Sequence, residues 1–149
     1  LSMEIAILGL GCFWGPEIKF SKLDGVVKTE VGYCGGNSSE TTYKEVCTGT
    51  TNHAEVVKLD FDPKIISYEK ILKFFFEIHD PTTLNSQGPD FGTQYRSEIF
   101  YLNDQQKEIS EKVIKEENIK FSGKIVTKTS LVKNYCLAEE YHQKYLEKR

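Results

Sequence analysis

A strand that runs directly into a helix is the feature that most constrains how this chain of 149 residues can fold. Residues 4–9 read Glu-Ile-Ala-Ile-Leu-Gly, a short apolar run bounded by glycine, which is typical of a buried strand. Residues 11–17 follow as Gly-Cys-Phe-Trp-Gly-Pro-Glu, and Pro16 suits the first turn of a helix because its missing N–H costs nothing there. Cys12 is therefore expected at a helix N-terminus, whose partial positive charge favours a thiolate. We interpret Cys12 as a nucleophile; the alternative is a core cysteine packed among aromatic rings.

The remaining apolar patterns predict a mixed α/β domain. The strands are expected at residues 26–33, 53–61, 97–102 and 125–131, and the helices from Pro16, from Ser67 to about His79, from Asp104 to Asn118 and from Leu137 to Leu146. The leading order is strand, helix, strand, strand, helix, strand, which is the split βαββαβ arrangement with a mostly antiparallel sheet and helices on one face. We predict a single domain over residues 1–149. On the helices, Glu108/Lys112 and Glu111/Lys115 are expected to form exposed i,i+4 pairs, and Tyr141 and Tyr145 to stack one turn apart.

Composition and charge exclude several classes of function. The chain carries 19 Lys and Arg against 22 Asp and Glu, a net charge of −3, which gives no basic footprint for nucleic acid. No apolar run approaches membrane-spanning length, and no signal peptide is visible. The 4 cysteines form no C-x-x-C pair and fit neither a zinc knuckle nor a disulfide scaffold, so we expect reduced thiols, no metal and a cytoplasmic location. Leu1 and Ser2 precede Met3, and we expect them to be a cloning remnant.

A carboxylate falls on the core side of the third predicted strand. Its apolar side carries Val57 and Leu59, and counting back in twos reaches Glu55 and then His53. A carboxylate on that side is either paired or chemically active, and no cation lies on its own face of the strand. Residues 80–96 form a long stretch without periodicity, and such a loop in a compact domain is usually functional or disordered. Its aromatic and amide content favours a function.

Four blocks of the sequence together resemble one known family. They are Gly-Cys-Phe-Trp-Gly at residues 11–15, Tyr43 through His-Ala-Glu at residues 53–55, Gly-Pro-Asp-Phe-Gly-Thr-Gln-Tyr-Arg-Ser at residues 88–97, and Ala-Glu-Glu-Tyr-His-Gln at residues 138–143. In this order, over residues 5–145, they closely resemble peptide methionine sulfoxide reductase A, which reduces the S epimer of methionine sulfoxide. The resemblance implies a two-layer α/β domain of ferredoxin-like type and a role in the repair of oxidised proteins under oxidative stress.

The resemblance also implies a role for each site residue. Cys12 matches the nucleophile of the family and Glu55 its acid, and burial of Glu55 favours a protonated carboxyl near neutral pH. Tyr43 and Tyr95 would donate hydrogen bonds to the sulfoxide oxygen, because that oxygen leaves only when it is protonated and held. Phe13 and Trp14 would form the pocket for the terminal methyl group, and Asp90 would fix the substrate backbone. His53 is expected to order the strand entrance beside the substrate, with a base for Cys12 as the alternative; His79 and His142 are expected at a helix end and on the surface.

The sequence departs from the family most clearly in how it could be recycled. The product is a sulfenic acid on Cys12, which a thiol must reduce. Many relatives carry recycling cysteines in a glycine-rich tail, and none follows Cys136 here. We therefore expect no cofactor and a one-cysteine cycle served by glutaredoxin with glutathione, or by thioredoxin, with Cys136 and then Cys34 as possible resolving cysteines; Cys47 is expected to be packed. Some relatives carry selenocysteine at position 12, and Pro16, Cys34 and Asn52 also differ from the commoner residues of the family.

Two functions of other classes are the alternatives. A cysteine hydrolase would use Cys12, His53 and an acid for acyl transfer, a reaction that does not need Glu55 on the core side. A non-catalytic module would bind exposed methionine in an aromatic pocket, and its binding would survive the substitution Cys12→Ser.

Overall fold

The computed structural model describes residues 2–149, so Leu1, part of the expected remnant, lies outside the described residues. The main sheet has six strands in the order β7-β6-β1-β3-β2-β8. Its strands are β1 (Glu4–Leu10), β2 (Val26–Cys34), β3 (Ala54–Phe61), β6 (Ser97–Tyr101), β7 (Lys128–Leu131) and β8 (Cys136–Leu137), and β4 (Ser86–Gln87) pairs with β5 (Asp90–Phe91) in a separate hairpin. The helices are α1 (Trp14–Ser21), α2 (Tyr43–Cys47), α3 (Tyr68–Glu77), α4 (Asp104–Lys120) and α5 (Tyr145–Lys148).

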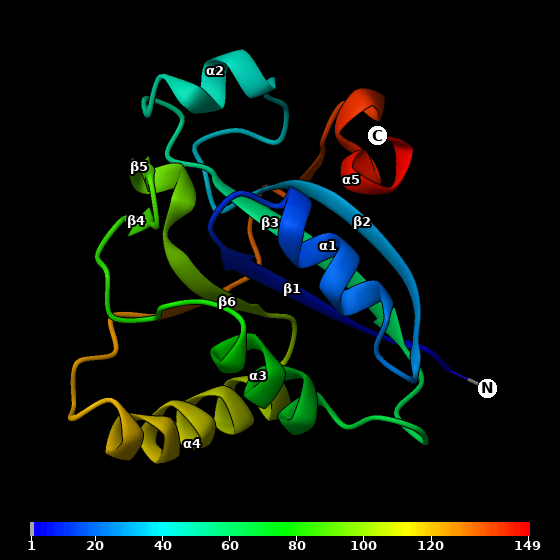
Figure 1. Cartoon of the computed structure of the whole chain (residues 1–149), viewed down its shortest axis with the longest axis vertical. Coiled ribbons are helices and arrows are strands. Elements are labelled where there is room, and N and C mark those ends of the chain that lie inside the picture. The colour runs from blue at the N-terminus through cyan, green and yellow to red at the C-terminus, as the bar shows by residue number, and fades with distance from the viewer. Residues whose placement is uncertain (1) are drawn as a thin grey trace.

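The predicted βαββαβ arrangement is confirmed. Strands β6, β1, β3 and β2 are neighbours and run antiparallel, with α1 connecting β1 to β2 and α3 lying between β3 and β6 in the chain. The two outer strands extend this core, since β7 pairs parallel to β6 and β8 pairs antiparallel to β2. In Figure 1, α2, the β4–β5 hairpin and α5 gather at the end of the sheet where α1 begins. None of the helices formed by residues 2–149 is long and apolar enough to cross a membrane.

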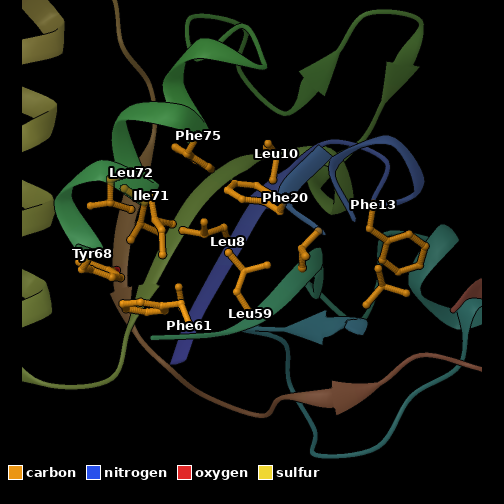
Figure 2. Close-up of a cluster of buried hydrophobic side chains, with 14 of the residues drawn as sticks. Leu8, Leu10, Phe13, Phe20, Leu59, Phe61, Tyr68, Ile71, Leu72 and Phe75 are labelled. Atoms are coloured by element: carbon orange, nitrogen blue, oxygen red, sulfur yellow. The ribbon is translucent and has the colours of Figure 1, made fainter. Parts of the chain in front are cut away.

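Strand alternation divides the buried residues between the two faces of the sheet. The larger core joins Leu8 and Leu59 of the sheet to Phe20 of α1 and to Ile71 and Phe75 of α3 (Figure 2). The smaller cluster contains Ile7, Cys34, Ala54, Val56 and Phe100. Successive residues of a strand point to opposite faces. Tyr33 therefore joins the larger core while its neighbour Cys34 joins the smaller cluster.

The predicted helix over residues 137–146 is wrong. Residues Cys136–Leu137 form β8, Glu140–His142 form a single 3-10 turn, and Lys144 has a φ of 50°, which interrupts any continuous helix. Hydrogen bonds to distant parts of the chain replace the helical ones. The Gln143 side chain, for example, accepts from the N–H of Val31 and donates to its C=O, both at 2.9 Å. Tyr145 stacks on Trp14, at a centroid distance of 3.9 Å, and not on Tyr141.

Two smaller expectations also need correction. Neither predicted i,i+4 pair of α4 forms in the part of the chain that the structure describes. In the first pair, Lys112 instead donates to Glu69 of α3 at 2.8 Å. The helix α2 was not predicted; Thr42 accepts a hydrogen bond from the Glu45 N–H and caps it. The last predicted strand is confirmed only from Lys128 onward.

Candidate active site

Cys12 lies on a tight turn between β1 and α1. Gly11 has a φ of 97°, and a Cβ on it would lie 2.8 Å from side-chain carbons of Gln87 in the hairpin. Only glycine adopts this conformation in so narrow a space without strain. The next residue, Phe13, is 1 % exposed and donates its N–H to Glu55 Oε1 at 3.2 Å. The turn therefore brings Cys12 and Glu55 together although the two residues are far apart in sequence.

The Cys12 side chain is half-buried and carries its proton at neutral pH. Burial is the largest cause, and it raises the pKa of Cys12 to about 11. The backbone N–H of Trp14 acts in the opposite direction, as expected for a helix N-terminus, whereas ionised Glu55 and Asp90 add to the rise. The helix N-terminus alone thus does not hold a thiolate in the free protein.

Glu55 is a buried acid on the core side of β3. It is 1 % exposed, and burial raises its pKa to about 8, with the Phe13 N–H opposing the shift and Asp90 adding to it. No ion pair involves Glu55 among the contacts of residues 2–149. A carboxyl with this pKa is mostly neutral at pH 7 and can donate a proton.

The two tyrosines reach the same place from different segments. Tyr43 begins α2, and its ring centroid lies 4.5 Å from that of His142. Tyr95 ends the 3-10 turn Thr93–Tyr95, and burial raises its pKa to about 12, with Glu55 the next cause. The charges of Asp90 and Cys12 also raise the pKa of Tyr95, so the phenol lies within electrostatic range of the Cys12 turn.

Asp90 lies on the side of the hairpin that faces Cys12. It pairs across the hairpin with Gln87, whose side chain contacts Gly11. Residues paired in this way share a face. Asp90 accordingly raises the pKa values of both Cys12 and Glu55. The next residue, Phe91, points outward and is 75 % exposed.

The structure adds His142 and Glu139 to the site, and the expectation that His142 is a surface residue is wrong. His142 is 1 % exposed; its Nδ1 accepts the indole N–H of Trp14 at 3.0 Å, and its ring lies 5.2 Å from that of Phe13. Glu139 accepts the Tyr33 hydroxyl at 2.7 Å and the Tyr43 N–H at 2.8 Å. The one sequence signal for both residues was the block at residues 138–143, which periodicity assigned to the helix predicted over residues 137–146.

The structure does not bring His53 to Cys12. His53 is fully buried, its Nε2 bonds the Ser38 C=O at 2.9 Å, and its ring fills the space that a Cβ on Gly36 would need. These contacts order the loop before β3, and burial lowers its pKa. A hydrolase built on Cys12 and His53 lacks its base in this arrangement.

The other three cysteines lie in different surroundings. Cys34 is buried in the smaller cluster, where its thiol donates to the Lys133 C=O at 3.3 Å, and Cys136 on β8 directs its thiol to the Thr41 C=O at 3.7 Å. Cys47 is exposed at the end of α2, so the expectation that it is packed is wrong. Its thiol is among the groups that raise the pKa of Cys12. No cluster of three or more His, Cys, Asp or Glu side chains able to hold a metal occurs within residues 2–149.

Comparison with known proteins gives one consistent result. The family model described as "Peptide methionine sulfoxide reductase" matches residues 4–149. The chain is 84 % identical over 147 residues to the peptide methionine sulfoxide reductase MsrA of Pelagibacter ubique (strain HTCC1062), covering 99 % of this chain and 100 % of the relative. The crystal structure of Mxr1 from Saccharomyces cerevisiae in reduced form superposes with a TM-score of 0.94 at 44 % identity, over 99 % of this chain and 86 % of that one. Mxr1 in complex with Trx2 gives a TM-score of 0.68 at 30 % identity, over 96 % of this chain and 84 % of that one.

Proposed function

The chain belongs to the peptide methionine sulfoxide reductase A family, and on that premise we propose that Cys12, Glu55, Tyr43 and Tyr95 carry out the reaction. The enzyme is an oxidoreductase that reduces methionine sulfoxide with thiols and so repairs oxidised proteins. The observation that carries the assignment of residues is a carboxyl with a pKa of about 8 beside the Cys12 turn. A mostly neutral acid next to a cysteine is what reduction of a sulfoxide requires.

The proposed reaction forms one S–O bond and breaks another. The Cys12 sulfur attacks the electrophilic sulfur of the sulfoxide while Glu55 delivers its proton to the sulfoxide oxygen. The S–S bond formed by this attack and the S–O bond of the sulfoxide then break as the oxygen moves to the Cys12 sulfur, which leaves Cys12 as a sulfenic acid and releases methionine. Glu55 recovers a proton from solvent, which balances the proton that Cys12 lost on forming the attacking thiolate. Hydroxyl groups of Tyr43 and Tyr95 hold the oxygen during the transfer, and Tyr95 is supported in this role by its interaction with the Glu55 charge.

The aromatic residues support an enclosed site for the substrate methyl group. Phe13 is 1 % exposed, and Trp14 is fixed on one side by Tyr145 and on another by His142. We propose that Asp90 on the hairpin holds the substrate backbone, and its pairing with Gln87 across the hairpin supports this role. A site that fixes the methyl group, the oxygen and the backbone together is chiral, so we propose that only the S epimer presents its oxygen to Glu55.

Separate diastereomers test this assignment. Turnover of methionine S-sulfoxide and methionine R-sulfoxide is measured with dithiothreitol as the reductant. We expect consumption of the S epimer alone, and equal rates on both epimers would overturn the assignment of the pocket.

For recycling we propose a one-cysteine cycle with thioredoxin, or glutaredoxin with glutathione, as the source of electrons. A first thiol forms a mixed disulfide with Cys12 and releases water, and a second thiol restores the Cys12 thiol. The yeast relative crystallised in complex with Trx2 supports thioredoxin as a partner. Cys34 is an unfavourable internal partner for Cys12, because disulfide formation needs Cα atoms within about 7 Å. Cys34 belongs to the smaller cluster, whereas Phe13, the neighbour of Cys12, belongs to the larger core on the other face of the sheet. Cys136 follows as the better candidate of the two, because it is half-buried on an edge strand.

Counting thiols tests the cycle. Fully reduced protein reacts with one equivalent of substrate without added thiol, and the remaining thiols are titrated. A one-cysteine cycle consumes a single thiol of the four free cysteines and leaves a sulfenic acid that dimedone traps. Loss of two thiols without a dimedone adduct would instead show an internal disulfide, and peptide mapping then identifies its second cysteine.

We further propose that residues 1–149 form one catalytic domain that works in the cytoplasm. The family match over residues 4–149 and a single sheet with one large core support the first part. The four free cysteines support a reducing compartment.

A further inference from the structure

The residues on both sides of His142 are tied to the body of the domain. The Gln143 side chain makes three hydrogen bonds, to the N–H and C=O of Val31 and to the C=O of Ala138. The Lys144 N–H donates to Glu17 at 2.8 Å, and Glu17 is 2 % exposed. His142 is thus carried to α1 on a backbone that is fixed independently of its own side chain.

Trp14 is held between two side chains of this C-terminal segment. The Tyr145 ring stacks on the indole at 3.9 Å with an interplanar angle of 11°, and the indole N–H donates to His142 Nδ1 at 3.0 Å. The stack restrains the tilt of the indole. The hydrogen bond adds a second restraint, because it holds one point on the rim of the indole.

The hydrogen bond defines the state of the imidazole. A neutral histidine has one N–H, so a ring that accepts at Nδ1 carries its proton on Nε2. Burial lowers the pKa of His142, with Glu139 opposing the shift, which favours the neutral ring. Its Nε2 is buried without a hydrogen-bond partner, among the rings of Phe13, Tyr43 and Tyr141. The Nε2–H of His142 is therefore a buried donor without an acceptor, and the hydrogen bond of the ring is the one that Nδ1 accepts from Trp14.

We infer that His142 is a positioning residue for substrate binding, which orients the Trp14 indole as the wall of the methyl pocket. The inference rests on the proposed role of Trp14 in that pocket. His142 acts through Trp14 and not on the sulfoxide, so its loss weakens substrate binding more than it slows the transfer of oxygen.

Two near-isosteric substitutions distinguish the role of Nδ1 of His142 from that of Nε2. In His142→Asn the amide oxygen can occupy the position of Nδ1 and still accept the indole N–H, whereas in His142→Gln the amide lies near the position of Nε2. Because the chain contains a single tryptophan, one indole N–H resonance and the tryptophan emission report on Trp14 alone. We expect His142→Gln to move the indole resonance, and to raise KM for methionine sulfoxide about tenfold, with the single-turnover rate at saturating substrate within about threefold. His142→Asn should stay close to the wild type in all three measurements.

Equal indole resonances and equal KM values in the two variants would overturn the inference, as would a loss of rate at saturating substrate without a change in KM. A measurement on the wild type guards against a variant that fails to fold: nitrogen chemical shifts of His142 should show an unprotonated Nδ1, and a protonated Nδ1 would refute the hydrogen bond directly. Trp14→Phe keeps the two proposals apart. If Trp14→Phe leaves KM unchanged, the methyl pocket is assigned wrongly. The indole N–H resonances of the wild type and of the two His142 variants still report whether His142 holds Trp14.

Discussion

The substitution Glu55→Gln tests the acid with the least change of shape. The amide keeps an oxygen able to accept the Phe13 N–H, a hydrogen bond of 3.2 Å in the wild type, but it has no proton to deliver. A positioned general acid contributes about 10²–10⁴ in rate, so we expect the reductive step to slow by about 10² or more with substrate affinity little changed.

The pKa values of the two groups also predict the shape of the pH profile. The reactive combination is neutral Glu55 with the Cys12 thiolate, and the pKa values are about 8 for Glu55 and about 11 for Cys12. Below pH 8, kcat/KM for the reductive step should rise about tenfold per pH unit, because the thiolate fraction rises while Glu55 stays neutral. Above pH 8 the loss of neutral Glu55 cancels the gain in thiolate, so the profile becomes level.

In Glu55→Gln the break near pH 8 should disappear and the residual rate should continue to rise with pH. The pKa of Cys12 should itself fall in this variant, because ionised Glu55 is one cause of its rise. Stopped-flow single turnovers with methionine S-sulfoxide give the profile, and thiolate absorbance gives the pKa of Cys12. Asp90→Asn is the matched control: it should keep the break and move it to lower pH, since Asp90 raises the pKa of Glu55. A break that persists in Glu55→Gln would place the acid elsewhere.

Three further substitutions test the parts that surround this pair. Gly11→Ala should destabilise the protein by about 1–3 kcal/mol in urea unfolding, because Gly11 has a φ of 97° and a Cβ would meet Gln87 at 2.8 Å; unchanged stability would contradict the account of this turn. Tyr95→Phe should slow the reductive step by about 10² or more without unfolding the protein, because one donor to the oxygen is lost; a wild-type rate would remove Tyr95 from the site. Glu98→Gln should lower the free energy of unfolding, measured in urea or by heating, by about 3–5 kcal/mol, because it leaves Arg96, buried and 2.6 Å from Glu98, without its charged partner. A cost below about 1 kcal/mol would mean that the C=O groups of Thr93 and Asn52, to which Arg96 also donates, suffice.

The order of strands and helices along the chain and the position of Glu55 could be predicted because both depend on local patterns. Alternation of apolar residues fixed the strands and, by counting in twos, placed Glu55 on the core side of β3. Burial of a carboxyl raises its pKa wherever no cation is paired with it, so the direction of the Glu55 shift followed from its face of the strand.

The C-terminal segment could not be predicted in the same way, because distant contacts decide its conformation. The spacing of Leu137, Tyr141 and Tyr145 fits a helix, but the side chain of Gln143 bonds β2 and the Lys144 N–H bonds Glu17 of α1. The burial of His142 follows from these bonds, so the local apolar pattern does not indicate it. The pKa of Cys12 is a similar case, since the helix N-terminus is visible in the sequence while the depth of burial that outweighs it is not.

The hydrogen bond between Trp14 and His142 joins residues 128 positions apart, and this separation has a consequence for biosynthesis. A ribosome adds about 5–20 residues per second from the N-terminus, so Cys12 and Trp14 leave it several seconds before His142 is made. The nascent chain therefore carries its reactive thiol for that time without the indole in its final orientation. Oxidation of methionine by reactive species does not wait for this contact, yet on the inference above the molecule binds its substrate at full strength only when the segment around His142 has docked. A protease that trims the exposed helix α5 would leave His142 in place but would remove Tyr145, the ring that stacks on Trp14.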